Sequence, residues 1–214
     1  MQLNSLFGGA MVERTLANLP VRALFRPKDA FEALAGSDPS PANVLLRYSV
    51  WLLILPPLFS WIGASIFGWR LGATEPLYLS QLTLVRISVG YFLALLFGFV
   101  STALISQWMA KTYGASESLG RHFAMVTIVG SPLALASVAH LVPDVFFNVL
   151  VLIPTMIWSM YLLYSGIAVA LETVPERGML MASSLVGWLL VAAVSLLGLS
   201  MGLWVMGIGP LLGV

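Results

Sequence analysis

The chain has 214 residues, of which 59% are hydrophobic and 9% are charged, and its mean hydropathy is +0.96. Soluble domains carry about 25% charged residues, so this composition excludes a water-soluble protein and indicates an integral membrane protein. A net charge of +1 provides no field that attracts nucleic acid. Because the sequence contains no cysteine and only two histidines, we expect no metal site and no cofactor.

Residues 1–40 are predicted to form a cytoplasmic arm with one amphipathic helix. The segment from Arg22 to Gly36 has a proline suited to a helix start and a glycine suited to a helix stop, but too few apolar residues to cross a membrane. Basic residues beside an apolar face favour a helix that lies in the plane of the lipid headgroups. The candidate lipid contacts are Arg22, Arg26, Lys28 and Phe31. In the alternative interpretation, this helix packs against the protein's own membrane spans.

Five hydrophobic segments follow, and together they predict a membrane domain over residues 41–214. Each segment has about 20 residues or more, which is enough to cross ~30 Å of hydrocarbon as a helix. The predicted spans cover residues 44–67, 84–110, 122–141, 149–171 and 180–206. The predicted fold class is therefore all-α: a polytopic membrane protein with a five-transmembrane-helix bundle and a short N-terminal interfacial helix.

Arg86 lies just inside the start of the second span. A guanidinium group at the hydrocarbon boundary needs an anionic partner or a route to the headgroup region. Three interpretations follow: Arg86 binds a lipid headgroup, pairs with Glu75 in the preceding connection, or anchors the helix at the interface.

Two patterns around the fourth span are candidate polar sites. His140 and Asp144 flank the short connection before this span, and they form either a proton-sensitive pair or a solvated helix end. Within the span, Trp158, Tyr161 and Ser165 recur at spacings of three and four residues, which places them on one helix face. We expect this face to contact protein or the water boundary.

A charged turn separates the fourth and fifth spans. Glu172, Glu176 and Arg177 in this turn are candidate residues for docking a soluble partner, and the alternative is a helix end whose charges are satisfied locally. In the fifth span, Gly198 and Gly202 form a GxxxG pattern. This pattern allows either a homo-oligomer contact or close packing within the monomer.

The distribution of basic residues predicts the orientation in the membrane. Lys and Arg gather in the N-terminal arm and in the second and fourth connections, whereas only Arg70 and Arg86 lie toward the other side. By the positive-inside rule, the arm and these two connections are cytoplasmic. An odd number of spans then places the C-terminus outside.

Three stretches of sequence resemble a known family: LFRPKDAFEAL, YGASESLGRHFAMVTIVGSPLALASVAHLVP and WSMYLLYSGIAVALETVPERGMLMASSLVGW. From about Leu24 onward the chain resembles the Yip family (Ypt/Rab-interacting proteins), in particular its short prokaryotic branch. The resemblance implies five spans, a cytoplasmic N-terminus and, for prokaryotic relatives, the inner membrane. Eukaryotic members are associated with trafficking, Rab-type GTPases and membrane shaping. The long cytosolic region and the Asp-Leu-Tyr-Gly-Pro motif of those members are absent here, which argues against GTPase binding.

The sequence contains no phosphate-binding loop, dinucleotide fingerprint or nucleophile elbow, so we expect no catalytic residues and no enzyme. The expected function is to organise membrane lipids or partner membrane proteins without catalysis, alone or as a homo-oligomer. A second hypothesis is a transporter or channel for a small solute or lipid, because prolines interrupt three spans and broken helices often line binding sites. The interrupting residues are Pro56, Pro57, Pro132 and Pro154. A third hypothesis is an accessory subunit of a larger membrane complex.

Overall fold

The computed structural model describes residues 22–70, 72 and 75–205. In chain order the elements are α2 (Pro27–Ala35), α3 (Pro41–Val44), the π-helical turn η1 (Leu45–Ser49), α4 (Val50–Phe67), α5 (Gln81–Tyr113), α6 (Leu119–Ala136), the 3-10 turn η2 (Ser137–Leu141), α7 (Val145–Ala170) and α8 (Pro175–Val205). Five helical stretches are long and apolar enough to cross a membrane. The predicted all-α polytopic fold is confirmed.

The helices begin several residues before the hydrophobic segments that predicted them. A side-chain oxygen caps the start of α5, α6 and α7 by accepting a backbone N–H of the first turn. The pairs are Ser80 with Thr83, Ser118 with Arg121, and Asp144 with Phe147. Hydropathy marks the part of a helix that lies in hydrocarbon, whereas these caps mark where the helix itself starts.

The first span is one helical path from Pro41 to Phe67 with a widened turn near its start. Within this turn, the Ser49 hydroxyl lies 3.1 Å from the Val44 carbonyl and 2.7 Å from the Thr127 hydroxyl of α6. The chain stays helical through both Pro56 and Pro57. The polar contact with Thr127 therefore joins α4 to α6 within the membrane, where such contacts help to hold helices together.

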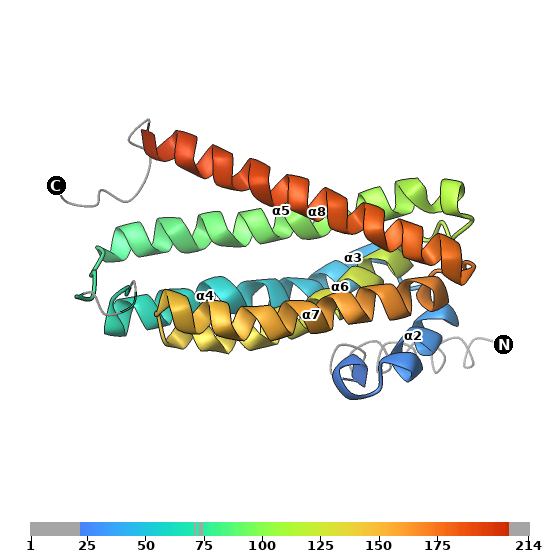
Figure 1. Ribbon diagram of the computed structural model, residues 1–214, viewed down its shortest axis with the longest axis horizontal. Helices are drawn as coiled ribbons and strands as arrows, with labels where there is room; N and C mark the ends of the chain where they lie inside the picture. The colour runs from blue at the N-terminus through green and yellow to red at the C-terminus, as the bar shows by residue number, and fades with distance from the viewer. Residues whose placement is uncertain (1–21, 71, 73–74, 206–214) are drawn as a thin grey trace, which may run out of the picture.

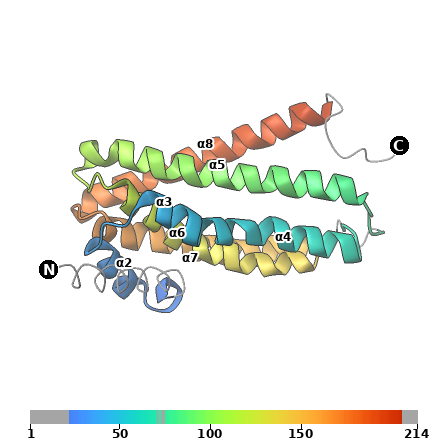
Figure 2. The same cartoon turned by 180° about the vertical axis from the view of Figure 1, so that it is seen from behind.

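The five spans run side by side along the long axis of the molecule (Figures 1 and 2). α6 contacts α4, α5 and α7, and η2 at its end packs against α4. Of the residues in the most apolar part of each span, 44% are buried for α6 but only 11% for α7, so α6 is the central helix. α8 contacts α5 and α7 near the end that carries α2 and diverges from the bundle toward its own C-terminal end (Figure 1).

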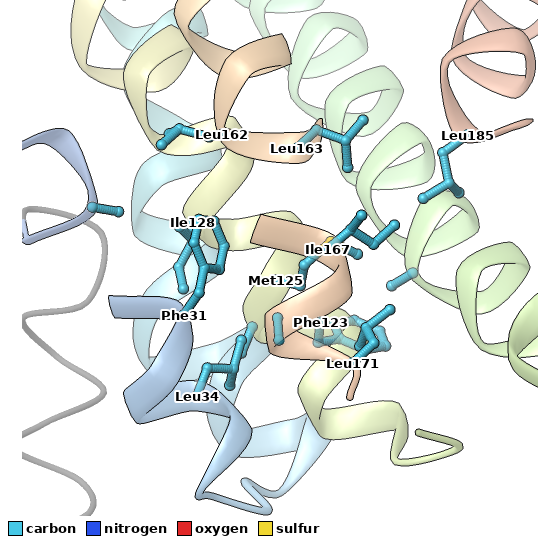
Figure 3. Packing of buried hydrophobic residues seen from close by; sticks show 14 of the residues in the cluster. Phe31, Leu34, Phe123, Met125, Ile128, Leu162, Leu163, Ile167, Leu171 and Leu185 are labelled. Atoms are coloured by element: carbon cyan, nitrogen blue, oxygen red, sulfur yellow. The ribbon is translucent and has the colours of Figure 1, made fainter. Parts of the chain in front are cut away.

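The hydrophobic core lies near the end of the bundle that carries α2, which we call the α2 end. Side chains from α2, α6, α7 and α8 meet there (Figure 3). The largest fully buried ones are Phe31, Leu34, Met125, Ile128, Leu162, Ile167, Leu171, Met181 and Leu185. Toward the opposite end, α8 exposes Val194, Leu197 and Met201, as expected for a helix surrounded by lipid.

Candidate functional site

The arm helix α2 packs on the flank of the bundle. Phe31 is 1% exposed and Leu34 is fully buried, and α2 contacts α7 and α6. Phe31 lies directly on Gly166 of α7, because a methyl group built at Gly166 would overlap the phenyl ring. Gly166 precedes the end of α7 by four residues, about 6 Å along the helix. α2 therefore lies beside the membrane spans and not beyond them (Figures 1 and 2).

For the apolar face of α2, this packing supports the interpretation in which the arm helix packs against the protein's own membrane spans. Phe31 is a core residue and is not available to lipid, which corrects its assignment as a lipid contact. The basic residues Arg22, Arg26 and Lys28 are exposed, and Phe25 beside them is 82% exposed. The three basic residues remain candidates for contact with lipid headgroups.

The linker between α2 and α3, residues 36–40, is bonded to the start of α6. The Arg121 Nε donates to the Ser37 carbonyl at 2.7 Å, and the Ser118 hydroxyl donates to the Asp38 carboxylate. The Pro39 carbonyl lies so close to Gly120 that a methyl group on Gly120 would overlap it. The linker thus approaches the helix as closely as backbone atoms allow.

Arg121 also forms an ion pair with one of the predicted docking residues. Its guanidinium lies 2.5 Å from the Glu172 carboxylate, and the Arg121 side chain is only 15% exposed. Glu172 has a positive φ of 55°, which bends the chain sharply after α7. The local interpretation therefore holds for Glu172. Glu176 and Arg177 are exposed and stay candidate docking residues.

Backbone and hydroxyl hydrogen bonds join the two connections at the α2 end. The Ser116 N–H donates to the Leu171 carbonyl at 2.7 Å, and the Thr173 hydroxyl donates to the Tyr113 carbonyl at 2.7 Å. Around these bonds, four exposed charged residues form what we call the α2-end face. They are Lys111, Glu117, Glu176 and Arg177.

His122 is a buried crosslink that sequence reasoning did not single out. Its side chain is fully buried, with Nε2 2.8 Å from the Ser116 carbonyl and Nδ1 2.7 Å from the Ser106 hydroxyl. Because a carbonyl only accepts, Nε2 carries the proton and Nδ1 accepts from Ser106. Both ring nitrogens are thus satisfied, and His122 ties α5 and the α5–α6 connection to α6. No sequence motif marks this role.

At the opposite end, His140 and Asp144 do not pair with each other, and of their two interpretations the helix end applies to Asp144. His140 Nδ1 lies 2.5 Å from the Asn148 side-chain oxygen, whereas Asp144 accepts the Phe147 N–H at 2.8 Å as the cap of α7. The helix start takes the carboxylate because its free backbone N–H groups lie nearest to it.

The polar and aromatic face of α7 is turned away from the bundle. The rings of Trp158 and Tyr161 are 5.1 Å apart and are 38% and 49% exposed. The Ser165 hydroxyl donates to the Tyr161 carbonyl of its own helix at 2.6 Å. This face is therefore free for lipid or for another protein.

A groove of about 280 Å³ lies between α4 and α5. Its walls include Pro57, Leu58 and Trp61 of α4, and Ser88, Val89 and Phe92 of α5. It lies at Pro57, one of the four prolines on which the transporter hypothesis rests. Pro132 is buried and Pro154 is exposed.

Arg86 follows the groove-lining residue Val85 in α5 and is exposed. Within the described part of the chain, Arg86 has no ion pair, including with Glu75. The pair with Glu75 is therefore excluded, and two interpretations of Arg86 stay: contact with a lipid headgroup, and an anchor at the membrane interface.

Comparison with known proteins places this architecture in a family. The family model described as the Yip1 domain matches residues 21–209. The chain belongs to the Yip1 domain family. The inner membrane protein YohC of Escherichia coli K12 is 29% identical over 150 residues, which cover 70% of this chain and 77% of YohC. YohC of E. coli O6:H1 matches to the same extent. No solved structure matches significantly.

The Yip1 match extends over α2 and all five spans, so the arm helix and the bundle fall within one family domain. This agrees with the packing of Phe31 on Gly166, which makes α2 part of the core. The resemblance inferred from the sequence is confirmed, and the chain is a multi-pass membrane protein of the Yip1 domain family.

Proposed function

We propose that this Yip1-domain protein is a non-enzymatic protein of the bacterial inner membrane that organises partner membrane proteins through its α2-end face. The relatives named above are inner membrane proteins, and the basic residues gather at the α2 end. We place that end in the cytoplasm on the positive-inside rule.

The observation that carries this proposal is the rigidity of the α2 end. The buried core, the Arg121–Glu172 ion pair and the Ser116 and Thr173 hydrogen bonds all lie there. A surface whose backbone is already held in place loses less conformational entropy on binding than a mobile loop. The α2-end face carries charges of both signs, which suits a polar protein partner better than a purely anionic surface.

Photocrosslinking in the native membrane tests this function. A benzophenone amino acid placed at Glu176 is expected to give discrete protein adducts. The matched control is the same group at Phe97 of α5, which is 58% exposed within a membrane span. Protein adducts that are absent at Glu176, or equal at both positions, would refute the proposal.

The orientation is tested independently of the partner. Tags at Met1 and Val214 are expected to report from opposite sides of the membrane. Tags that report from one side would remove the cytoplasmic assignment of the α2-end face.

The groove between α4 and α5 favours a second candidate function, in lipid handling. The walls of the groove are almost entirely apolar, and the helices that form it are membrane spans.

A role as an accessory subunit is a special case of the first proposal, and co-purification of a fixed complex after gentle solubilisation would distinguish it. α8 also leaves room for a second copy of the chain, because no atom of the described residues lies within 4 Å of a methyl group built at Gly198 or Gly202.

A further inference from the structure

We propose that the groove between α4 and α5 binds one phospholipid from the leaflet opposite α2, with its phosphate on Arg86 and one acyl chain along Phe92. In the orientation proposed above, this is the outer leaflet. The inference does not depend on the partner-organising function, because it concerns the other end of the bundle.

The length of α5 indicates at which level of the membrane the groove lies. The helix has 33 residues, about 50 Å at 1.5 Å per residue, whereas the hydrocarbon layer is ~30 Å thick. If the excess is shared between both ends, the first ~10 Å of α5 lie in the headgroup region. Trp69 and Tyr78, exposed in the preceding connection, are at the level expected for interfacial aromatic residues.

Arg86, Ser88 and Phe92 then lie at successive levels of a lipid molecule. Counted from Gln81, they lie roughly 8, 10 and 16 Å along α5. Arg86 is thus in the headgroup region, Ser88 is at the boundary where glycerol esters lie, and Phe92 is within hydrocarbon. The polarity of these three α5 residues falls in the same order as that of the successive parts of a phospholipid.

Arg86 provides the charge complementarity. It is exposed and has no ion pair within the described ranges. A guanidinium group at the hydrocarbon boundary is costly without an anion, and its planar set of N–H donors matches a phosphate group. Phosphate is the anion that phospholipids supply at this depth, and in phosphatidylglycerol no headgroup cation balances its charge, whereas in phosphatidylcholine the choline group does.

The walls of the groove suit an acyl chain. They are almost entirely apolar and include Leu58, Val89 and Phe92. Apolar walls favour a hydrocarbon tail, so the ester and phosphate groups of the lipid stay outside the groove, on the side of Arg86.

The size of the groove limits what it can hold. Its volume of about 280 Å³ is near the lower end of ligand pockets, which begin at about 300 Å³. It can therefore hold part of one acyl chain but not a whole lipid. A chain bound here leaves its headgroup outside the groove, beside Arg86.

Native mass spectrometry of the full-length protein tests the proposal. Purified protein is incubated in detergent with 1-palmitoyl-2-oleoyl-phosphatidylglycerol. Three variants are compared with the wild type: Arg86→Gln removes the charge, Val89→Phe fills the groove, and Val191→Phe is the matched control. Val89 and Val191 are 52% and 61% exposed, so neither substitution disturbs the core.

We expect the wild type and Val191→Phe to retain one lipid. Arg86→Gln and Val89→Phe are each expected to weaken retention about tenfold, the factor that corresponds to about 1.4 kcal/mol. Equal retention by all four proteins would overturn the proposal. A loss in Val191→Phe equal to that in Val89→Phe would also overturn it, because the loss would not be specific to the groove.

A second measurement reports on the same contact in a bilayer. The protein is reconstituted in dioleoylphosphatidylcholine vesicles that contain a small fraction of phosphatidylglycerol brominated on its acyl chains. Bromine quenches tryptophan fluorescence on contact, and the contribution of Trp61 is the difference between the wild type and Trp61→Phe. We expect this contribution to be quenched more than the bulk lipid fraction predicts, and the excess to disappear in Arg86→Gln. Quenching of Trp61 equal to the bulk fraction would refute the site.

Discussion

The docking of α2 on α7 depends on one glycine, and replacing Gly166 with alanine should loosen it. The added methyl group would overlap the ring of Phe31, and this ring is only 1% exposed, so it cannot turn aside into solvent. Overpacking of a buried contact costs about 1–3 kcal/mol. Alanine favours a helix by up to about 1 kcal/mol over glycine, which offsets part of that cost.

Gly187→Ala is the control that separates these two effects. Nothing lies within 4 Å of a methyl group built at Gly187 in α8, so this variant gains the helix preference without the overlap. The difference in docking free energy between the two variants should therefore be about 1–3 kcal/mol. This corresponds to a change of roughly 5- to 150-fold in the docking equilibrium.

Thiol labelling measures this equilibrium directly. The chain has no cysteine, and Leu34 on the docked face of α2 is fully buried, so a Leu34→Cys background carries a single reporter. In the Leu34→Cys background, maleimide should label the Gly166→Ala protein roughly 5- to 150-fold faster than the Gly187→Ala control. Equal rates in the two variants would show that α2 does not rest on Gly166, and rapid labelling in Leu34→Cys alone would show that α2 is not docked.

The interactions of the linker and the turn give two further predictions, both measured by thermal unfolding of purified protein in detergent. Arg121→Ala should lower the free energy of unfolding by about 1–3 kcal/mol, because a nearly buried guanidinium loses its bonds to Glu172 and to the Ser37 carbonyl. Glu172→Ala should cost less, about 0–1 kcal/mol, since Glu172 is 56% exposed. Equal losses in the two variants would contradict the assignment of a second stabilising bond of Arg121, to the Ser37 carbonyl. Gly120→Ala should be more damaging than Gly166→Ala, because its methyl group meets the Pro39 carbonyl, a backbone atom that cannot move without the linker. A Gly120→Ala protein as stable as the wild type would refute that close approach.

The membrane spans differ in exposure although they are similarly apolar. α6 is central and α7 is mostly lipid-facing toward the opposite end, although the two have similar mean hydropathies of 1.7 and 1.9. Lipid tails and leucine side chains are equally apolar, so hydropathy does not distinguish the two environments. The buried polar residues of α6, such as His122 and Thr127, carry the difference, because they need partners on neighbouring helices.

The sequence by itself determined the class of protein and the number of helices that are long and apolar enough to cross a membrane. The length of the apolar segments predicts five spans, since a helix must satisfy all its backbone groups within hydrocarbon. The same local rules place α2, which begins at Pro27 and ends before Gly36. These features depend on residues that are close together in the chain.

Only the tertiary structure decided what each face contacts. The apolar face of α2 suits lipid and protein equally, and the gap at Gly166, more than a hundred residues away, selects protein. Glu172 was a candidate for docking or for a local contact, and the packing of α6 beside the end of α7 places Arg121 2.5 Å from it. The groove beside Arg86 is formed by two helices together, so no single segment encodes it. Hydrophobic patterning specifies that a surface is apolar, but the identity of its neighbour depends on shapes that meet only after the helices pack.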